Sequence, residues 1–488
     1  MERLAIRGGD SDVRDSNESS FWIAFALVAL VVCLGVANGG FFQSTWNWCL
    51  VVAAVVVLAT VRTLSLVQLN RCEWLAVCLL LAFGTWTLVA GAWAQDPAAS
   101  RIQANRLLLY LSFFTVALLA TRSAGSLVGG TMIGIIAINL YALAAYLVVG
   151  NTPLPEPLES YLLFRPVGYA NALGVLAAMG LVAALGLAAE VEDERIARAC
   201  AATWAPLTAT LVLTQSRGAW LAFLLGISVV AVVLGWKARP TLLMAAPVIA
   251  ATAAFSWFAH LERLDHSFNL GRARALALAI VALSAVAYLA WPYLRDRFSV
   301  SSRRFAIAIA TCLILALGLV ATLALSHSIE RLGVRQAYWR VAWHLVTHHT
   351  LSGAGPGAFA AAWQRLGDGT SALNAHNLYL ETLAETGLIG LLLLMGFFVV
   401  PVVARRSTLQ QRYVATALGA YTVFLSHMVV DWDWQMPVVA ISGLAFGAAL
   451  LVVSRSDTTP ALGTAGRHRL MLASIAVLAI AVGELISR

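Results

Sequence analysis

Apolar stretches of about 20 residues recur along the whole chain, and this feature restricts the possible folds more than any other. A helix needs about 20 mainly apolar residues to cross a bilayer, because every backbone amide in hydrocarbon must find its hydrogen-bond partner within the segment. Of the 488 residues, 60% are hydrophobic and only 11% are charged, whereas soluble domains carry about 25% charged residues. The sequence therefore excludes a soluble globule and predicts an all-α, polytopic membrane helix bundle.

About fifteen segments are candidates for membrane spans. Three of them, 105–121, 200–213 and 412–428, are short or diluted by polar residues, so we expect about 12 to 15 true spans. The first segment lacks a small-residue cleavage site and is expected to be an anchor rather than a removed signal peptide. The candidate spans are residues 21–39, 46–66, 73–93, 105–121, 126–149, 168–189, 200–213, 218–236, 240–259, 273–293, 305–325, 386–404, 412–428, 434–454 and 467–487.

The basic residues of the short loops fall mostly on one side of the predicted bundle. Cytoplasmic loops carry an excess of lysine and arginine, and this rule places the N-terminus inside. Residues 1–20 are then a disordered cytoplasmic tail, and residues 21–325 and 386–488 hold the spans. Residues 326–385 form one long extracytoplasmic loop, in which we expect short helices and the catalytic groups. The net charge of +8 follows from this topology and predicts no nucleic-acid partner.

Two arginines stand at the outer ends of predicted spans. Arg217 follows Thr-Gln-Ser in a tight hairpin close to the bilayer edge, and Arg165 precedes the span that starts at Gly168. A charge beside hydrocarbon is costly and tends to mark function. The plainer alternatives are that Arg217 reaches lipid headgroups and that Arg165 orders a helix N-terminus.

The long loop begins with an amphipathic stretch and continues with a glycine-rich turn. Residues 335–348 have the pattern of a helix on the membrane surface, with Trp339, Trp343 and Leu345 as apolar anchors. The turn at residues 353–357 allows backbone to approach closely, either to a ligand or to another helix.

His376 opens a segment that we expect to be helical and to lead into the span at 386–404. At helical spacing Asn377, Glu381 and Glu385 share one face of this segment. An isolated histidine is usually structural. This one stands at the entrance of the bundle beside two carboxylates, which favours a catalytic histidine.

These motifs resemble the O-antigen ligase and O-antigen polymerase superfamily of bacterial membrane glycosyltransferases. The match covers residues from about 214 to 435, and the first half of the chain fits mainly in its hydrophobicity. It is carried by Ser216-Arg217-Gly218, by Arg335-x3-Trp339 followed by Leu351-x-Gly353-x-Gly355-Pro-Gly357-x-Phe359, by His376-Asn377-x-Tyr379-Leu380-Glu381-x3-Glu385-x-Gly387-Leu-Ile-Gly390, and more weakly by Arg165-x2-Gly168-x2-Asn171.

The resemblance implies inverting transfer of a glycan from undecaprenyl diphosphate to an acceptor hydroxyl, on the outer face of the bacterial inner membrane. His376 would remove the acceptor proton, since a neutral imidazole is a suitable base near neutral pH. Arg217 and Arg335, with Arg165 and Arg340 as further candidates, would neutralise the diphosphate, which arginine binds bidentately. The supporting residues are Asn377, Tyr379, Glu381, Trp339, Gly355, Gly357 and Asp431. The expected partners are the carrier-linked glycan, an acceptor glycolipid or glycan, and the lipid bilayer.

The need for a metal ion is a separate question. The first external loop, residues 40–45, has no carboxylate, and the one D-x-D pattern is Asp431-Trp-Asp433. Two carboxylates can bind magnesium or pair with arginine. We predict that the arginines take the place of a cation, and that neither a metal nor a cofactor is required.

The sequence does not decide which class of molecule accepts the glycan. It is lipid A-core for a ligase, a carrier-linked glycan for a polymerase, or a protein for an O-oligosaccharyltransferase. We favour the ligase, because the long loop that carries the histidine matches that pattern. A lipid or solute transporter also has many spans, but its ionisable residues would lie near the middle of the membrane, where this sequence has few.

Overall fold

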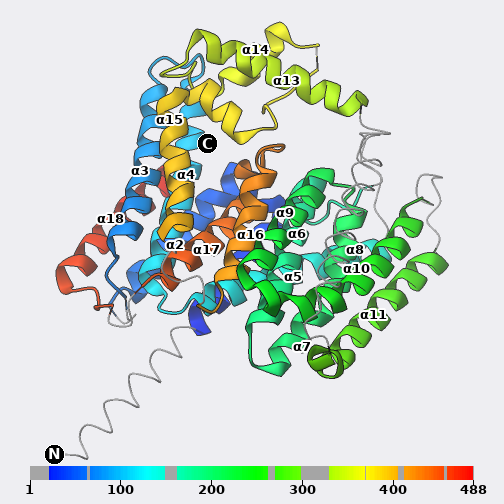
Figure 1. Ribbon diagram of the computed structural model, residues 1–488. Coiled ribbons are helices and arrows are strands. Elements are labelled where there is room, and N and C mark those ends of the chain that lie inside the picture. The colour runs from blue at the N-terminus through cyan, green and yellow to red at the C-terminus, as the bar shows by residue number, and fades with distance from the viewer. Residues whose placement is uncertain are drawn as a thin grey trace, which may run out of the picture.

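The protein is a bundle of long helices capped at one end by two further helices (Figure 1). A computed structural model of the chain describes residues 21–62, 66–148, 162–261, 270–297, 329–368, 370–404, 411–455 and 459–486. The predicted tail at residues 1–20 and the predicted span at 305–325 lie outside these ranges.

The elements of the described ranges are helices, with one isolated antiparallel bridge between Val67 and Ala461. Among the described residues, ten helical segments are long and apolar enough to cross a membrane, and Phe21–Val36 is one of three shorter apolar helices. The predicted all-α membrane bundle is therefore confirmed. The elements are η1 (Asn38–Gly40), α2 (Gln43–Thr60), α3 (Arg71–Ala90), α4 (Pro97–Ala120), α5 (Ala124–Val148), α6 (Ala170–Glu190), α7 (Glu194–Ala202), α8 (Trp204–Leu213), α9 (Arg217–Leu234), η2 (Gly235–Lys237), α10 (Ala238–Leu261), α11 (Leu270–Arg297), α13 (Ile329–His348), α14 (Ala358–Leu366), α15 (Leu378–Ala404), α16 (Val414–His427), η5 (Asp433–Gln435), α17 (Pro437–Val453) and α18 (Thr464–Ile486).

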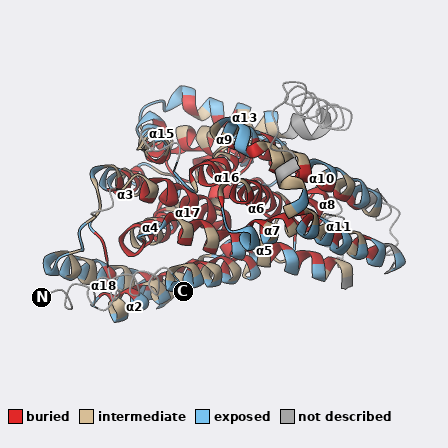
Figure 2. Ribbon diagram, turned by 60° about the horizontal axis from the view of Figure 1, so that its bottom comes forward, coloured by how far each residue is buried: buried red, intermediate tan, exposed pale blue. Residues whose placement is uncertain are grey.

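Helices α6, α16 and α17 form the centre of the bundle, and α2, α11 and α18 lie at its edge (Figure 2). The most apolar window of α6 is 94% buried, whereas that of α18 is 11% buried although both are strongly hydrophobic. Small residues allow the central helices to approach closely. A Cβ atom at Gly186 of α6 would lie 2.6 Å from Thr416 Oγ1 of α16. Lipid therefore faces the outer helices, while α6 is covered by protein.

Helices α13 and α14 lie together at one end of the bundle, which we call the outer end (top of Figure 1). They pack on the first turns of α15 through a small apolar core that includes Ala342, Phe359 and Ala384. The predicted helix at 335–348 is confirmed within α13. Of its three predicted anchors, Trp343 is exposed, while Leu345 packs against this small core.

Two contacts, one at each end of the bundle, join segments that are far apart in the sequence. At the outer end the indole N–H of Trp93 donates to the carbonyl of Gly353 (3.1 Å). At the opposite end Arg455 pairs with Glu73 at 2.6 Å.

Several predicted boundaries were wrong. Helix α4 begins at Pro97 rather than near residue 105. The apolar span predicted from residue 386 is part of a longer helix, α15, which begins at Leu378 and so confirms the helix expected to lead from His376 into that span. The predicted span at 200–213 is two helices, α7 and α8, which meet at Thr203. Hydropathy missed the polar first turns of α4 and α15, because these turns face a polar cavity inside the protein rather than lipid.

Candidate functional site

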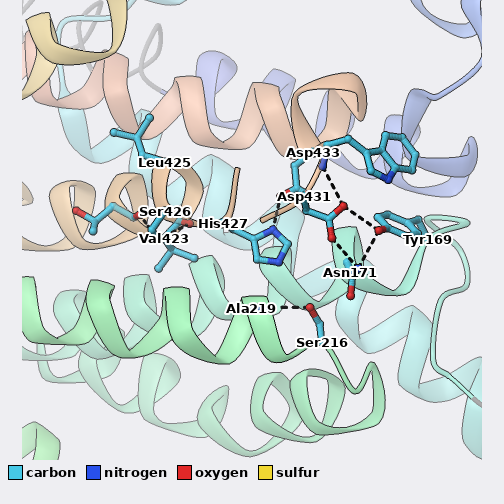
Figure 3. A network of polar contacts seen from close by, with 12 residues as sticks. Tyr169, Asn171, Ser216, Ala219, Val423, Leu425, Ser426, His427, Asp431 and Asp433 are labelled. Carbon is cyan, nitrogen blue, oxygen red and sulfur yellow. Dashed lines mark hydrogen bonds and ion pairs between the residues drawn. The ribbon is translucent and has the colours of Figure 1, made fainter. Parts of the chain in front are cut away.

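Asp431 is the centre of a polar network at the outer end of the bundle (Figure 3). Its side chain is 1% exposed. One carboxylate oxygen accepts from the Tyr169 hydroxyl (2.8 Å) and from the N–H of Trp432 (2.9 Å), and the other accepts from Nδ2 of Asn171 (2.6 Å). Arg335 lies 3.4 Å from the second oxygen. A buried carboxylate needs such donors, and here they join three separate parts of the chain.

The parts of this network come from the ends of helices. Tyr169 stands directly before α6 and Asn171 lies in its first turn, so the positive end of the α6 dipole is close to the Asp431 carboxylate. Asp431 itself follows α16, and Arg335 projects from α13. The Tyr169 ring stacks on Trp432 with 4.8 Å between ring centroids. The network therefore fixes the external helix α13 to the bundle.

His376 is half-buried beside this network, directly before α15. Its imidazole stacks on the Tyr338 ring at 5.2 Å, and its ring centroid lies 6.5 Å from that of Trp432. Nδ1 lies 3.1 Å from the carbonyl oxygen of Asn374. A carbonyl only accepts hydrogen bonds, so Nδ1 carries a proton and Nε2 of the neutral ring keeps its lone pair.

The surroundings of His376 favour the neutral imidazole. Burial lowers the pKa of His376 below its usual value near 6.5; the charge of Asp431 opposes this shift and the charge of Arg335 adds to it. The carboxylate that acts on His376 is therefore Asp431, and Glu381 faces elsewhere. Nε2 can accept a proton at neutral pH.

Glu381 and Asn377 hold the loop that carries His376. One Glu381 oxygen accepts from the backbone N–H of Ala375 at 2.6 Å. The Asn377 side chain accepts from the N–H of Leu380 at 3.0 Å and so caps the first turn of α15. His376 has a φ of +52°, a strained conformation for a residue with a side chain. The hydrogen bonds of Glu381 and Asn377, on either side of His376, maintain this conformation.

The sequence left two alternatives for the glycine-rich turn at residues 353–357, which were close approach to a ligand or to another helix. In the structure the turn packs against α15. The N–H of Gly355 donates to the carbonyl of Glu385 at 2.9 Å. A Cβ atom at Gly353 would lie 2.3 Å from the Glu385 backbone, and one at Gly387 would lie 2.2 Å from the Leu351 carbonyl. Gly357, with a φ of +80°, stands directly before α14. The turn therefore fixes α13 and α14 against the first turns of α15.

Arg217 begins helix α9, directly after Ser216, whose hydroxyl accepts from the N–H of Ala219. The next residue, Gly218, packs against the His427 ring, because a Cβ atom there would lie 3.0 Å from Nε2. His427 is fully buried and pairs with Asp433 (Figure 3). The start of α9 and the turn that bears Asp431 are thus in direct contact.

The other predicted site residues lie outside the Asp431 network. Arg165 is exposed, with its guanidinium carbon 5.8 Å from the centre of the Phe164 ring. Arg340 is exposed and lines an open cavity of about 420 Å³ between α13 and α14. The Tyr379 hydroxyl donates to the carbonyl of Leu425 at 2.8 Å and so joins α15 to α16. Trp339 is half-buried on α13.

Both carboxylates of Asp431-Trp-Asp433 have side-chain partners. Asp431 faces Arg335, and Asp433 faces His427. Within the described ranges no group of three or more His, Cys, Asp or Glu side chains is arranged to hold a metal ion.

Sequence reasoning missed Tyr169, Arg106 and Gln435. Arg106 lies inside α4 and is 8% exposed. An arginine within an apolar segment is a signal of function that could have identified it. Tyr169 and Gln435 have no such signal, because a lone tyrosine or glutamine beside a span is common.

The fold and the site define a multi-pass helical membrane protein with a polar centre at one end, beneath two short external helices. Residues 266–395 match the family model described as O-antigen ligase. This match confirms the resemblance to the O-antigen ligase and polymerase superfamily, and it supports a membrane glycosyltransferase of that type. It includes Arg335 and His376 but ends before Asp431. No curated protein matches the chain.

Proposed function

We propose that the protein transfers a glycan from undecaprenyl diphosphate to an acceptor hydroxyl at the outer face of the bacterial inner membrane. The observation that carries this proposal is the position of His376. Its Nε2 keeps a free lone pair beside Arg335 and Asp431, within the segment that matches the O-antigen ligase family. A base beside a cation suits attack on a carbon that bears an anionic leaving group.

The proposed reaction is a single displacement. Nε2 of His376 takes the proton of the acceptor hydroxyl while the acceptor oxygen bonds to C1 of the sugar. The bond between C1 and the diphosphate oxygen breaks with inversion, and undecaprenyl diphosphate leaves with the electron pair. The Asp431 carboxylate stabilises the imidazolium that forms.

The arginines provide the positive charge that the leaving group needs. Arg335 has a side chain that is 29% exposed, so its guanidinium can contact a diphosphate while it stays close to Asp431. Arg217 is half-buried at the start of α9, next to Gly218, which contacts His427 and Val430 close to Asp431. Arg165 and Arg340 are exposed and would act, if at all, on outlying parts of the donor. We infer that the reaction needs no divalent cation.

The proposed acceptor is lipid A-core. The test uses purified protein in proteoliposomes with a carrier-linked repeat unit and one of three acceptors: lipid A-core, a second carrier-linked unit, or an acceptor protein. Transfer to lipid A-core that is lost in His376→Ala is expected. Chain extension alone would assign a polymerase, and transfer only to protein would assign an O-oligosaccharyltransferase. No transfer to any acceptor, with uptake of solute or lipid instead, would reject the proposal.

A further inference from the structure

Gln435 lies behind the His376 loop and contacts three of its neighbours. Its Nε2 donates to Oδ1 of Asn374 and, at 2.9 Å, to Oε1 of Glu381. Its Oε1 accepts from Nη1 of Arg106 at 3.5 Å, which is long for a hydrogen bond. Both donors and the acceptor of one amide are therefore in use.

The orientation of the Gln435 amide follows from its partners. Arg106 only donates, so the Gln435 oxygen must face Arg106, and the Gln435 nitrogen then faces Glu381. Asn374 supplies the carbonyl that binds Nδ1 of His376, and Glu381 binds the N–H of Ala375. Gln435 thus contacts Asn374, whose carbonyl binds Nδ1 of His376. It also contacts Glu381, which binds the N–H of Ala375 directly before His376.

Arg106 and Glu381 line an enclosed cavity of about 30 Å³ beneath this loop, together with Gln103 and Glu385. Arg106 is 8% exposed, Glu381 is 7% exposed and Glu385 is 4% exposed. Buried charges are costly unless they are balanced and hydrogen-bonded. Arg106 and the two carboxylates line the same cavity, and each oxygen of Glu381 accepts one hydrogen bond, Oε1 from Gln435 and Oε2 from the N–H of Ala375.

We propose that Gln435, supported by Arg106, is a positioning residue that holds His376 with Nδ1 on the Asn374 carbonyl and Nε2 turned toward the acceptor. This inference rests on the proposed base role of His376. Neither residue touches the reacting atoms. A reacting group that is misplaced by about 1 Å can lose about 10²-fold in rate, so loss of Gln435 should lower turnover rather than donor binding.

The cavity offers a matched control. Gln103 lies on the same cavity, and its Nε2 donates to Oε2 of Glu385 at 3.0 Å. Glu385 holds the N–H of Phe359 rather than the His376 loop. Gln103→Met and Gln435→Met therefore each remove one amide from the same cavity, and only the second removes contacts with the His376 loop.

The experiment measures single-turnover transfer and donor affinity for full-length protein in proteoliposomes. Gln435→Met should lower the transfer rate by about 10- to 100-fold with unchanged donor affinity, and Gln103→Met should stay close to wild type. Gln435→Glu places a carboxylate against Glu381 and should be at least as impaired. Arg106→Lys should recover more activity than Arg106→Gln, because it keeps the charge.

A double-mutant cycle with His376→Ala separates positioning from general damage. If Gln435 acts through His376, then Gln435→Met should lower the residual rate of His376→Ala no further. An equal additional loss in that background would overturn the proposal, and so would unchanged activity in Gln435→Met. If Gln435→Met does not fold, Gln435→Asn, which keeps the amide but shortens its reach, takes its place in the cycle. Equal transfer rates in wild type and His376→Ala would instead reject the proposed base role of His376, and no transfer by the wild type would reject the proposed function itself.

Discussion

Arg335 and Asp431 form an ion pair between the external helix α13 and the bundle, with 3.4 Å between Nη2 and Oδ2. Asp431 is buried, whereas the Arg335 side chain is 29% exposed. The guanidinium therefore has one side against a fixed carboxylate and the rest toward solvent. Such an arrangement orients arginine for an anionic ligand before that ligand arrives.

Arg335→Ala should lower glycan transfer by at least about 10²-fold, because loss of one preorganised donor at a developing charge costs about 10²- to 10³-fold. Arg335→Lys should recover little, since an ammonium group cannot reproduce the bidentate fork. The measurement is transfer of labelled glycan in proteoliposomes. Arg365→Ala is the control, because Arg365 is an exposed arginine of α14 that contacts Ala361 and Gln95 and has no proposed role with the donor. Similar losses in both variants would contradict the role of Arg335.

Gly218→Ala should impair transfer although it adds only one methyl group. Its Cβ atom would lie 2.9 Å from Val430 and 3.0 Å from His427, so the turn that bears Asp431 or the start of α9 must move. Overpacking of this kind costs about 1 to 3 kcal/mol. We expect a lower melting temperature in detergent and reduced transfer. At Gly129 a Cβ atom would meet nothing within 4 Å, so Gly129→Ala is the matched control. Wild-type behaviour of Gly218→Ala would contradict this account.

The fold class could be predicted from the sequence because lipid selects strongly for apolar residues. The same signal failed where a helix faces protein. Gln103 and Arg106 in α4, and Glu381 and Glu385 in α15, lowered the local hydropathy and moved the starts of the predicted spans inward. Gln103, Glu381 and Glu385 form hydrogen bonds with one another or with backbone N–H groups. Tertiary contacts of this kind cannot be deduced from hydropathy.

The candidate site could be predicted only in part for a similar reason. His376 and Arg335 stand in motifs, so the sequence located them. The partners of Asp431 come from α6 and α13, far from it in the sequence, and no periodicity joins them. From the sequence we expected His376 to stand beside the carboxylates of Glu381 and Glu385. The chain turns at His376, with a φ of +52°, and this directs Glu381 to the loop backbone instead.

Excess EDTA should leave transfer largely unchanged. The arginines are proposed to neutralise the diphosphate, and the two carboxylates of the D-x-D pattern are already paired with Arg335 and His427. The assay compares initial rates with and without the chelator, and then with added magnesium. Loss of activity that magnesium restores would make Asp431 and Asp433 candidate metal ligands and would refute the proposed charge balance.

Reporters fused after Asp368 and after Trp432 should be extracytoplasmic, and a reporter after Arg239 should be cytoplasmic. The first two positions belong to the outer end of the bundle, and Arg239 lies in the first turn of α10, in a basic segment that the positive-inside rule retains in the cytoplasm. Enzymatic reporters that work on only one side of the membrane provide the measurement. A cytoplasmic reporter after Asp368 would place His376 on the wrong side for the proposed acceptor.

The acid limb of the pH–rate profile should report His376. The base is the neutral imidazole, so transfer is fully active above the pKa of His376 and falls as the pH drops through it. Burial lowers this pKa, so the midpoint should lie below the ordinary histidine value near 6.5. The negative charge of Asp431 favours the protonated ring, so Asp431→Asn should move the midpoint further down, in addition to weakening transfer.

His376→Ala separates proton removal from donor binding. Its affinity for the polyprenyl diphosphate donor should persist, because the arginines make those contacts, while turnover should fall by about 10²- to 10⁴-fold, the usual contribution of a general base. The acid limb should also disappear from its residual rate. Tyr338→Leu is a control for the packing of the imidazole, since Tyr338 stacks on it without exchanging a proton. If His376→Ala lost donor binding and kept the wild-type pH profile, His376 would be a ligand of the diphosphate, and the base would have to be sought elsewhere in the Asp431 network.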